Sequence, residues 1–181
     1  GIVDSEDLPL NVSREMLQDS RVVRTIRKQV VKRALDMIAE LAKGDDYDAF
    51  WSTYGAVLKE GLHFEPEYKD KLAKLVRYES STQDGLVSLE DYVSRMPEGQ
   101  ESIFYIQGAS RAIVENSPHL EGLKAKGYEV LFMTDAVDQW ATEGLDEFDG
   151  KKLVSVMDAD INLGEDESTQ EEKDAKEETS K

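Results

Sequence analysis

Residues 102–133 read SIFYIQGASRAIVENSPHLEGLKAKGYEVLFM, and this stretch decides the fold class. Ile103–Ile106 joins β-branched and aromatic residues in a short run, which favours a strand. Helical segments are predicted over Ala109–Asn116 and again from Pro118 onward. Tyr128–Met133 is almost continuously apolar, which predicts a second strand that is buried on both faces.

The alternation of strands and helices continues toward the C-terminus. A short helix is predicted around Val137–Glu143, and a third strand near Leu153–Met157. Upstream, Ser88 and the residues that follow it carry the signature of a helix start. The order strand, helix, strand, helix, strand predicts an α/β fold in which a small αβα unit contains a short, mainly parallel sheet. We place this unit at residues 86–158.

The sequence of the N-terminal half predicts helices throughout. Apolar residues recur at spacings of three and four from Val22 to Leu41, with Lys and Arg on the other faces. A second helix is expected over Tyr47–Glu60 and closed by Gly61, and a third follows Pro66. The buried side of the second helix is expected to carry Phe50, Trp51, Tyr54, Val57 and Leu58. Residues 1–85 are therefore predicted to form an all-helical subdomain, a three-helix coil.

Composition limits the classes of function. The chain has 181 residues, of which 39% are hydrophobic, and its net charge is −17. Such acidity argues against general affinity for nucleic acid or for an anionic membrane, and no run reaches the roughly 20 apolar residues of a membrane span. Cysteine is absent, which excludes disulfides and thiolate sites and is consistent with a cytoplasmic protein.

The charge is unevenly distributed along the chain. Basic residues outnumber acidic ones from Asn11 to Lys43, whereas residues 159–181 are strongly acidic and are predicted to be a linker. The opening residues GIVDSEDLPLN have neither the basic nor the apolar region of a signal peptide. We expect the sequence to be an internal piece of a longer chain.

Most motifs of enzymes and metal sites are absent from the sequence. It contains no glycine-rich phosphate loop and no nucleophile elbow. The two histidines, His63 and His119, stand alone in helix-boundary segments, and a zinc site would need at least one more close ligand, so no metal site is predicted.

Ser13-Arg14-Glu15-Met16-Leu17-Gln18 is the segment with the clearest potential for anion chemistry. With Ser13 as the N-cap, Arg14 would stand in the first turn of a helix, where backbone N–H groups favour anions. Its guanidinium matches phosphate oxygens, and Gln18 shares the same helical face. Judged by local chemistry alone, however, an Arg at a helix start is most often a surface residue.

Trp140 is open to two interpretations. A tryptophan on a short helix is more often a core anchor, but an exposed one would make an apolar contact for a partner protein. Trp51 belongs to an aromatic, periodic stretch and is predicted to be a core residue.

Several long segments resemble the 90-kDa heat-shock chaperone family. They are VDSEDLPLNVSREMLQDS (3–20), FWSTYGAVLKEG (50–61), SLEDYVSRMPEGQESIFYI (88–106), SPHLEGLKAKGYEVLFMTDAVDQW (117–140) and EFDGKKL (147–153). They follow the order of the C-terminal part of the family's middle domain, and the short spacings look more like the bacterial HtpG type. This resemblance covers residues 3 to 155.

The resemblance implies a mechanism in which the chain completes an ATPase. ATP with Mg binds a separate N-terminal domain that is not in this sequence, and the Arg and Gln of the middle-domain motif correspond to Arg14 and Gln18. Arg14 would contact the γ-phosphate, whereas this piece alone would neither hydrolyse ATP nor bind it well. The helix of Trp140 matches a region linked to client contact. Trp140, Gln139 and Glu143 are therefore the candidate client-binding residues, and Gln139 and Glu143 stand where some relatives carry Glu and Asn.

The resemblance also implies the partners. These are client proteins and the protein's own N-terminal ATPase domain, in a stress-response chaperone that is a homodimer at full length. Dimerisation belongs to a C-terminal domain beyond the acidic linker, so the piece itself is expected to be monomeric. The alternative is a non-catalytic interaction scaffold in which Arg14 has no nucleotide role. A nucleic-acid binder is disfavoured by charge and by the lack of aromatic residues among the basic ones.

Overall fold

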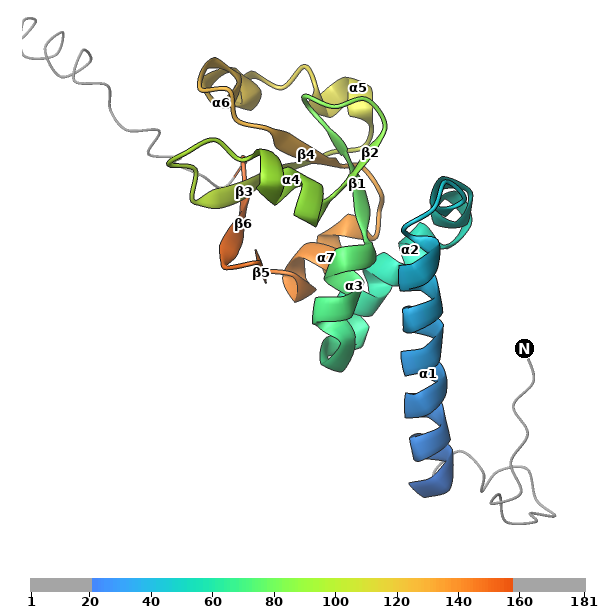
Figure 1. The fold of residues 1–181 in the computed structure, drawn as a ribbon. Coiled ribbons are helices and arrows are strands. Elements are labelled where there is room, and N and C mark those ends of the chain that lie inside the picture. Colours follow the sequence, from blue (N-terminus) through green and yellow to red (C-terminus); the bar gives the residue numbers. More distant parts are fainter. Residues whose placement is uncertain (1–20, 158–181) are drawn as a thin grey trace, which may run out of the picture. The chain divides into compact units, whose positions relative to one another are not determined.

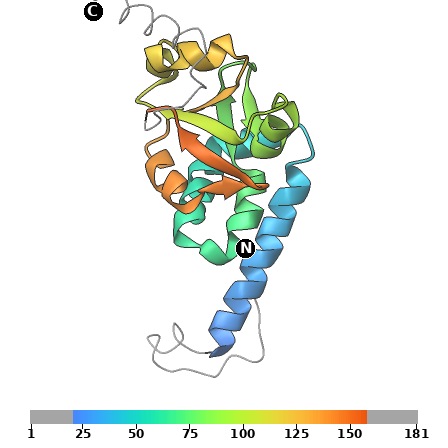
Figure 2. The same cartoon turned by 90° about the vertical axis from the view of Figure 1, so that its left-hand side faces the viewer.

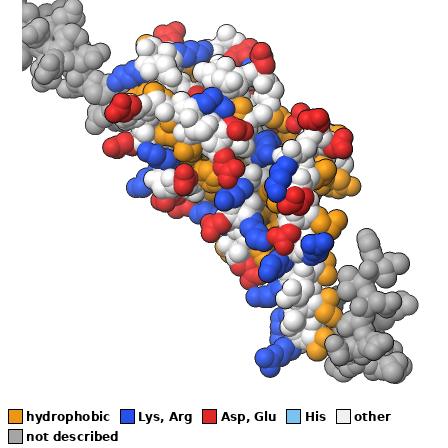
Figure 3. Space-filling view, in the orientation of Figure 1, with side chains coloured by type: hydrophobic (Ala, Val, Ile, Leu, Met, Phe, Trp, Pro, Cys, Tyr) orange, Lys and Arg blue, Asp and Glu red, His pale blue; other side chains and the backbone are white. Residues whose placement is uncertain are grey.

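The computed structural model describes residues 21–157, and the chain divides into two compact units, residues 1–50 and 51–181. The described part of the first unit holds α1 (Arg21–Leu41) and the start of α2 (Tyr47–Phe64). Figure 3 shows Lys and Arg along one side of α1 and hydrophobic side chains along another, as the periodicity predicts. The rings of Tyr47 and Phe50 stack with centroids 5.6 Å apart.

The second unit contains the rest of α2 and a sheet with helices on both faces (Figure 1). Its further elements are η2 (Pro66–Tyr68), α3 (Lys69–Leu75), β1 (Arg77–Ser80), β2 (Leu86–Ser88), α4 (Leu89–Arg95), β3 (Ser102–Gln107), α5 (Arg111–Val114), η3 (Pro118–Leu120), α6 (Glu121–Ala125), β4 (Val130–Met133), α7 (Asp138–Gly144), β5 (Glu147–Phe148) and β6 (Lys151–Ser155).

The sheet is mixed, with strand order β2-β1-β4-β3-β6-β5. Its centre is parallel, because β3 pairs with both β4 and β6 in parallel register. The remaining pairs, β1 with β2, β1 with β4 and β5 with β6, are antiparallel. The α/β fold class is thus confirmed, and all four residues of β4 are buried, as its apolar run predicts.

One face of the sheet is covered by α5, η3 and α6. These elements bury Val114, Leu120 and Leu123 against alternate residues of β3 and β4, including Phe104 and Phe132. The period of two places those residues on a single face. In Figures 1 and 2 the yellow helices α5 and α6 lie together on one side of the sheet, while the orange α7 lies away from them.

Ser88 is the N-cap of helix α4 and forms a capping box with Asp91, at the helix start that the sequence predicts. The Ser88 hydroxyl accepts a hydrogen bond from the Asp91 backbone N–H at 3.0 Å and donates one to Asp91 Oδ2 at 2.6 Å. The hydrogen bond from Ser88 lowers the pKa of the Asp91 carboxyl. Tyr92 ties the helix to the sheet, because its hydroxyl donates to Glu129 O and accepts from Phe104 N–H. Burial raises the pKa of Tyr92 to about 12.

The prediction that residues 1–85 are all helical is wrong at its C-terminal end. Strands β1 and β2 form an antiparallel hairpin in which Tyr78 pairs with Val87, both buried. The polar residues Arg77 and Glu79 alternate with the buried ones and conceal the strand pattern. The predicted subdomain boundary at residue 85 falls in the turn of this hairpin, and the division into subdomains stays a prediction.

Helix α2 also differs from expectation. It continues through Gly61 to Phe64. Gly61 leaves room for Leu72, whose Cδ1 atom would lie 2.9 Å from an added Cβ. Its buried stripe contains Trp51, Leu58 and Leu62, at spacings of seven and four. The expectation that Tyr54 and Val57 are buried is wrong: they lie off this stripe and are 53% and 60% exposed.

Among residues 21–157, none of the helices combines the length and the apolar character that crossing a membrane requires.

Candidate functional site on helix α7

The predicted site residues fall into two groups. Arg14 and Gln18 lie outside the described residues. Gln139, Trp140 and Glu143 all belong to α7, and each of the three is exposed. The structure therefore brings the second group together on one short helix.

Trp140 is not a core anchor. Its side chain is 48% exposed, and it contacts Phe64 edge-on, with ring centroids 6.1 Å apart and an interplanar angle of 69°. Phe64 is itself 62% exposed and comes from the last turn of α2. Two large aromatic side chains from distant segments thus form an exposed apolar surface, which we call the aromatic pair.

The neighbours of Trp140 face different surroundings. The Glu143 carboxylate lies 3.6 Å from His63 Nδ1, next to Phe64 in sequence. Gln139 instead lines a small cavity of about 200 Å³ at the carboxyl ends of β3 and β4, together with Gln107. Of Gln139 and Glu143, it is therefore Glu143 that lies at the same end of α2 as the aromatic pair.

A buried ion pair anchors the first turn of α7. Lys59, whose side chain is only 4% exposed, places Nζ 2.7 Å from Asp138 Oδ1 and 2.7 Å from Asp135 Oδ2. Asp138 Oδ2 accepts a further hydrogen bond from the Asp135 backbone N–H. The Lys59 ammonium also lies 4.6 Å from the ring centroid of Tyr78. Sequence reasoning missed Lys59, because a lysine on a helix is ordinarily a surface residue.

Burial governs the protonation of this cluster. It raises the pKa of Asp138, against the opposing effect of the Lys59 charge. It also raises the pKa of Tyr78, and the charges of Asp138 and Asp135 add to that effect. Tyr78 therefore stays a neutral phenol.

The end of α7 packs directly on the backbone of α2. A Cβ atom added to Gly144 would lie 2.2 Å from Leu62 O and 2.8 Å from His63 N. Only glycine allows this approach, and it positions α7 so that Trp140 meets Phe64. The sequence contains no signal for this contact, since Leu62 is distant along the chain.

Gly144→Ala is expected to destabilise the second unit by about 1–3 kcal/mol or more, because backbone atoms rather than flexible side chains must move. Urea unfolding, followed by the fluorescence of Trp51 and Trp140, would measure the change. Gly44→Ala is the matched control, since its Cβ would make only an ordinary 3.7 Å contact with Leu41 O. Equal stability of both variants would refute the proposed packing constraint.

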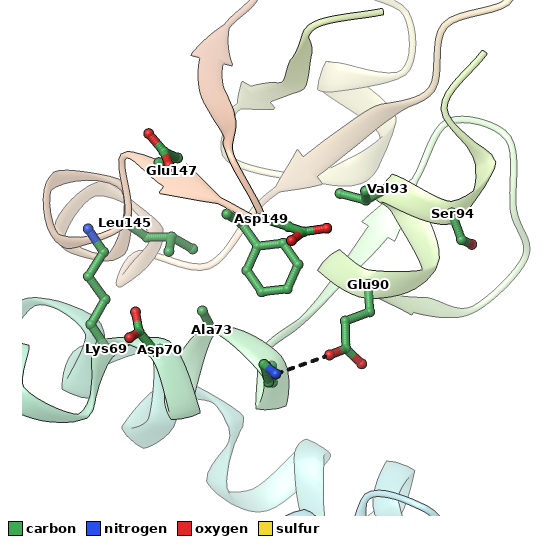
Figure 4. A pocket seen from close by; sticks show the side chains of 11 residues that line it. Lys69, Asp70, Ala73, Glu90, Val93, Ser94, Leu145, Glu147 and Asp149 are labelled. Atoms are coloured by element: carbon green, nitrogen blue, oxygen red, sulfur yellow. Dashed lines mark ion pairs between the residues drawn. The ribbon is translucent and has the colours of Figure 1, made fainter. Parts of the chain in front are cut away.

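A larger hollow of about 630 Å³ lies between α3, α4 and the segment after α7 (Figure 4). Leu145 and Ala73 contribute apolar surface to it, and Asp70, Glu90 and Asp149 contribute carboxylates. Within the described part of the chain, no group of three or more His, Asp or Glu side chains is arranged to hold a metal ion.

Comparison with known proteins identifies the family. The family model described as "Hsp90 protein" matches residues 1–181. "Chaperone protein HtpG" of Myxococcus xanthus is 61% identical over 175 residues, which cover 96% of this chain and 26% of that protein. The protein of the same name from Geobacter sulfurreducens is 48% identical, over 100% of this chain and 28% of its own length.

The fold comparison agrees with the sequence comparison. A solved structure of the middle domain of a Plasmodium falciparum heat shock protein matches with a TM-score of 0.74 and 31% identity, over 78% of this chain and 61% of that one. The chain spans about a quarter of the length of the curated relatives it matches. Because the family model covers every residue and the sequence identity is high, the chain belongs to the Hsp90 family.

Proposed function

We propose that this chain is the C-terminal part of the middle domain of an ATP-driven, cytoplasmic, HtpG-type chaperone, and that α7 presents a surface to unfolded client proteins. The observation that carries the client role is the aromatic pair. Trp140 and Phe64 are both large, apolar and exposed, and α7, which carries Trp140, is anchored to α2 by the Lys59–Asp138 ion pair and the Gly144 contact. Exposed aromatic side chains on a rigid support favour binding of apolar segments.

The proposed energy source lies outside this chain. In the full-length homodimer, ATP with Mg binds the N-terminal domain, and Arg14, assisted by Gln18, contacts the γ-phosphate. This part of the proposal is supported by family membership and by the sequence around Arg14. The 181-residue chain alone is expected to show no ATP hydrolysis.

Trp140→Ala in the full-length protein is expected to weaken binding of a permanently unfolded, reduced and alkylated model protein by about tenfold, because a half-exposed aromatic contact is lost. Basal ATP turnover should stay unchanged. Fluorescence anisotropy of the labelled model protein measures the affinity. Ile113→Ala is the control, since Ile113 is a comparably accessible apolar residue on α5 (61% exposed). If the Trp140→Ala protein binds the model protein with unchanged affinity, α7 is not part of the client-binding surface.

A further inference from the structure

The hollow beside α7 has an apolar floor. Ala73, Val93, Leu145 and Phe148 line it, and Phe148 is 9% exposed. These residues come from α3, α4, β5 and the residue after α7. A volume of about 630 Å³ lies within the range of binding pockets in proteins. The hollow is therefore large enough to accept side chains from another polypeptide.

The charges on the wall of the hollow are unbalanced. Lys69 is paired with the Asp146 carboxylate, and this hydrogen bond lowers the pKa of Asp146. Lys74 Nζ lies 3.7 Å from Glu90 Oε1, the pair marked by the dashed line in Figure 4.

Three further carboxylates line the same hollow, those of Asp70, Glu147 and Asp149, and all three residues are exposed. The residues that line the hollow carry four carboxylates, those of Asp70, Glu90, Glu147 and Asp149, against the two lysines Lys69 and Lys74, so negative charge is in excess by two. Figure 4 shows Asp70 and Asp149 on different elements around one opening. A positively charged occupant is complementary to this wall.

The aromatic pair and the lining of the hollow come from the same two segments of chain. Phe64 ends α2, and Lys69 begins α3 directly after the short helix η2. Trp140 lies on α7, and Leu145 follows that helix. The Lys69–Asp146 ion pair joins these two segments. Because the two surfaces share these segments, an extended polypeptide is the kind of occupant that suits both.

We propose that the aromatic pair and the hollow form one docking surface, whose occupant is an extended apolar client segment that carries Lys or Arg. Apolar side chains rest on Trp140 and Phe64 and on the floor of the hollow, and the basic groups face Asp70, Glu147 and Asp149. This inference rests on the proposed client role of α7 and adds a preference among clients. Neutral or acidic segments, and a second copy of this chain, are the competing occupants.

The charge preference is tested with labelled, unstructured peptides that share one Phe-Leu-Phe core. Their flanks consist of three Lys, three Ser or three Glu on each side, and anisotropy gives the Kd for the 181-residue chain. We expect the Lys-flanked peptide to bind at least about tenfold more tightly than the Glu-flanked one at about 0.05 M salt. The difference should shrink at about 0.5 M salt, where exposed charges are screened. Equal affinity of the Lys- and Glu-flanked peptides would overturn the proposal.

Substitutions then locate the two halves of the surface. The double substitution Asp70→Asn with Asp149→Asn should weaken binding of the Lys-flanked peptide about fivefold. It should leave the affinity for the Ser-flanked peptide unchanged. Asn suits position 149, whose φ of 50° lies in the left-handed region. Glu98→Gln with Glu121→Gln, both exposed, is the matched charge control. Phe64→Ala should weaken binding of both the Lys-flanked and the Ser-flanked peptide about fivefold, whereas Ile113→Ala should leave both affinities unchanged.

The outcomes separate this inference from the proposed function. If Trp140→Ala weakens binding but the Asp70/Asp149 variant does not, the client role of α7 stands and the charged half of the surface is refuted. If Trp140→Ala has no effect on any peptide or on the unfolded model protein, the proposed client role fails and the joint surface fails with it. Self-association of the chain that Phe64→Ala abolishes would show a second copy as the occupant and overturn the proposal.

Discussion

Arg14→Ala in the full-length protein is expected to lower ATP turnover by about a hundredfold or more, while the affinity for nucleotide stays nearly unchanged. A guanidinium that contacts the γ-phosphate stabilises charge that develops only in the transition state, so its loss reduces kcat rather than ground-state binding. Gln18→Ala should have a smaller effect, up to about tenfold, because a neutral hydrogen bond is weaker than a charged one. Steady-state phosphate release and nucleotide titration measure the two quantities.

Arg21→Ala provides the control for this experiment. Arg21 is an exposed residue of the same basic stretch, in the first turn of α1, so its loss removes one positive charge without the proposed phosphate contact. We expect its turnover to match that of the unmodified protein. Unchanged turnover in Arg14→Ala would favour the alternative, an interaction module without a nucleotide role.

Asp138→Ala is expected to destabilise the second unit by about 3–5 kcal/mol, since it leaves the buried Lys59 ammonium with Asp135 as its remaining carboxylate. The Asp138 side chain is only 1% exposed, so water cannot readily replace it. The first turn of α7 should loosen, and Trp140 fluorescence should shift before global unfolding. Urea unfolding followed by circular dichroism and fluorescence measures both effects.

Lys59→Met combined with Asp138→Leu tests whether the charge or the packing matters. Apolar residues of similar volume can replace a buried ion pair with little loss, so the double variant should be considerably more stable than Asp138→Ala alone. Glu115→Ala, which removes one partner of an exposed pair with Arg111, should cost at most about 1 kcal/mol. A similarly small loss in Asp138→Ala would contradict the anchoring role of the ion pair.

Local sequence patterns were sufficient to predict α1, α4, β3 and β4. The three- and four-residue spacing of apolar side chains predicts α1, and the runs around Phe104 and Leu131 predict the parallel strands β3 and β4. Ser88 predicts the start of α4 through its capping chemistry. These predictions succeed because each depends on residues within a few positions of one another.

Predictions that depended on distant neighbours failed. The polar residues of β1 mask its strand pattern in the sequence, and the strand pairs with β4, which lies far along the chain. Gly61 usually suggests a helix end, yet the helix continues to Phe64, and Leu72 occupies the space that a side chain at position 61 would need. Tyr54 and Val57 share the apolar character of Trp51, but only the packed structure determines which of them are covered.

The candidate site divides in the same way. By itself, the sequence determined the chemical identity of Arg14, Gln18 and Trp140 and the family to which their motifs belong, because such information lies in the order of residues. Only the tertiary structure decided that Trp140 is exposed, that Phe64 lies against it, and that Lys59 is buried beneath α7. Exposure, close packing and charge pairing depend on which distant segments come into contact. In this chain the deciding contact is between the end of α2 and α7.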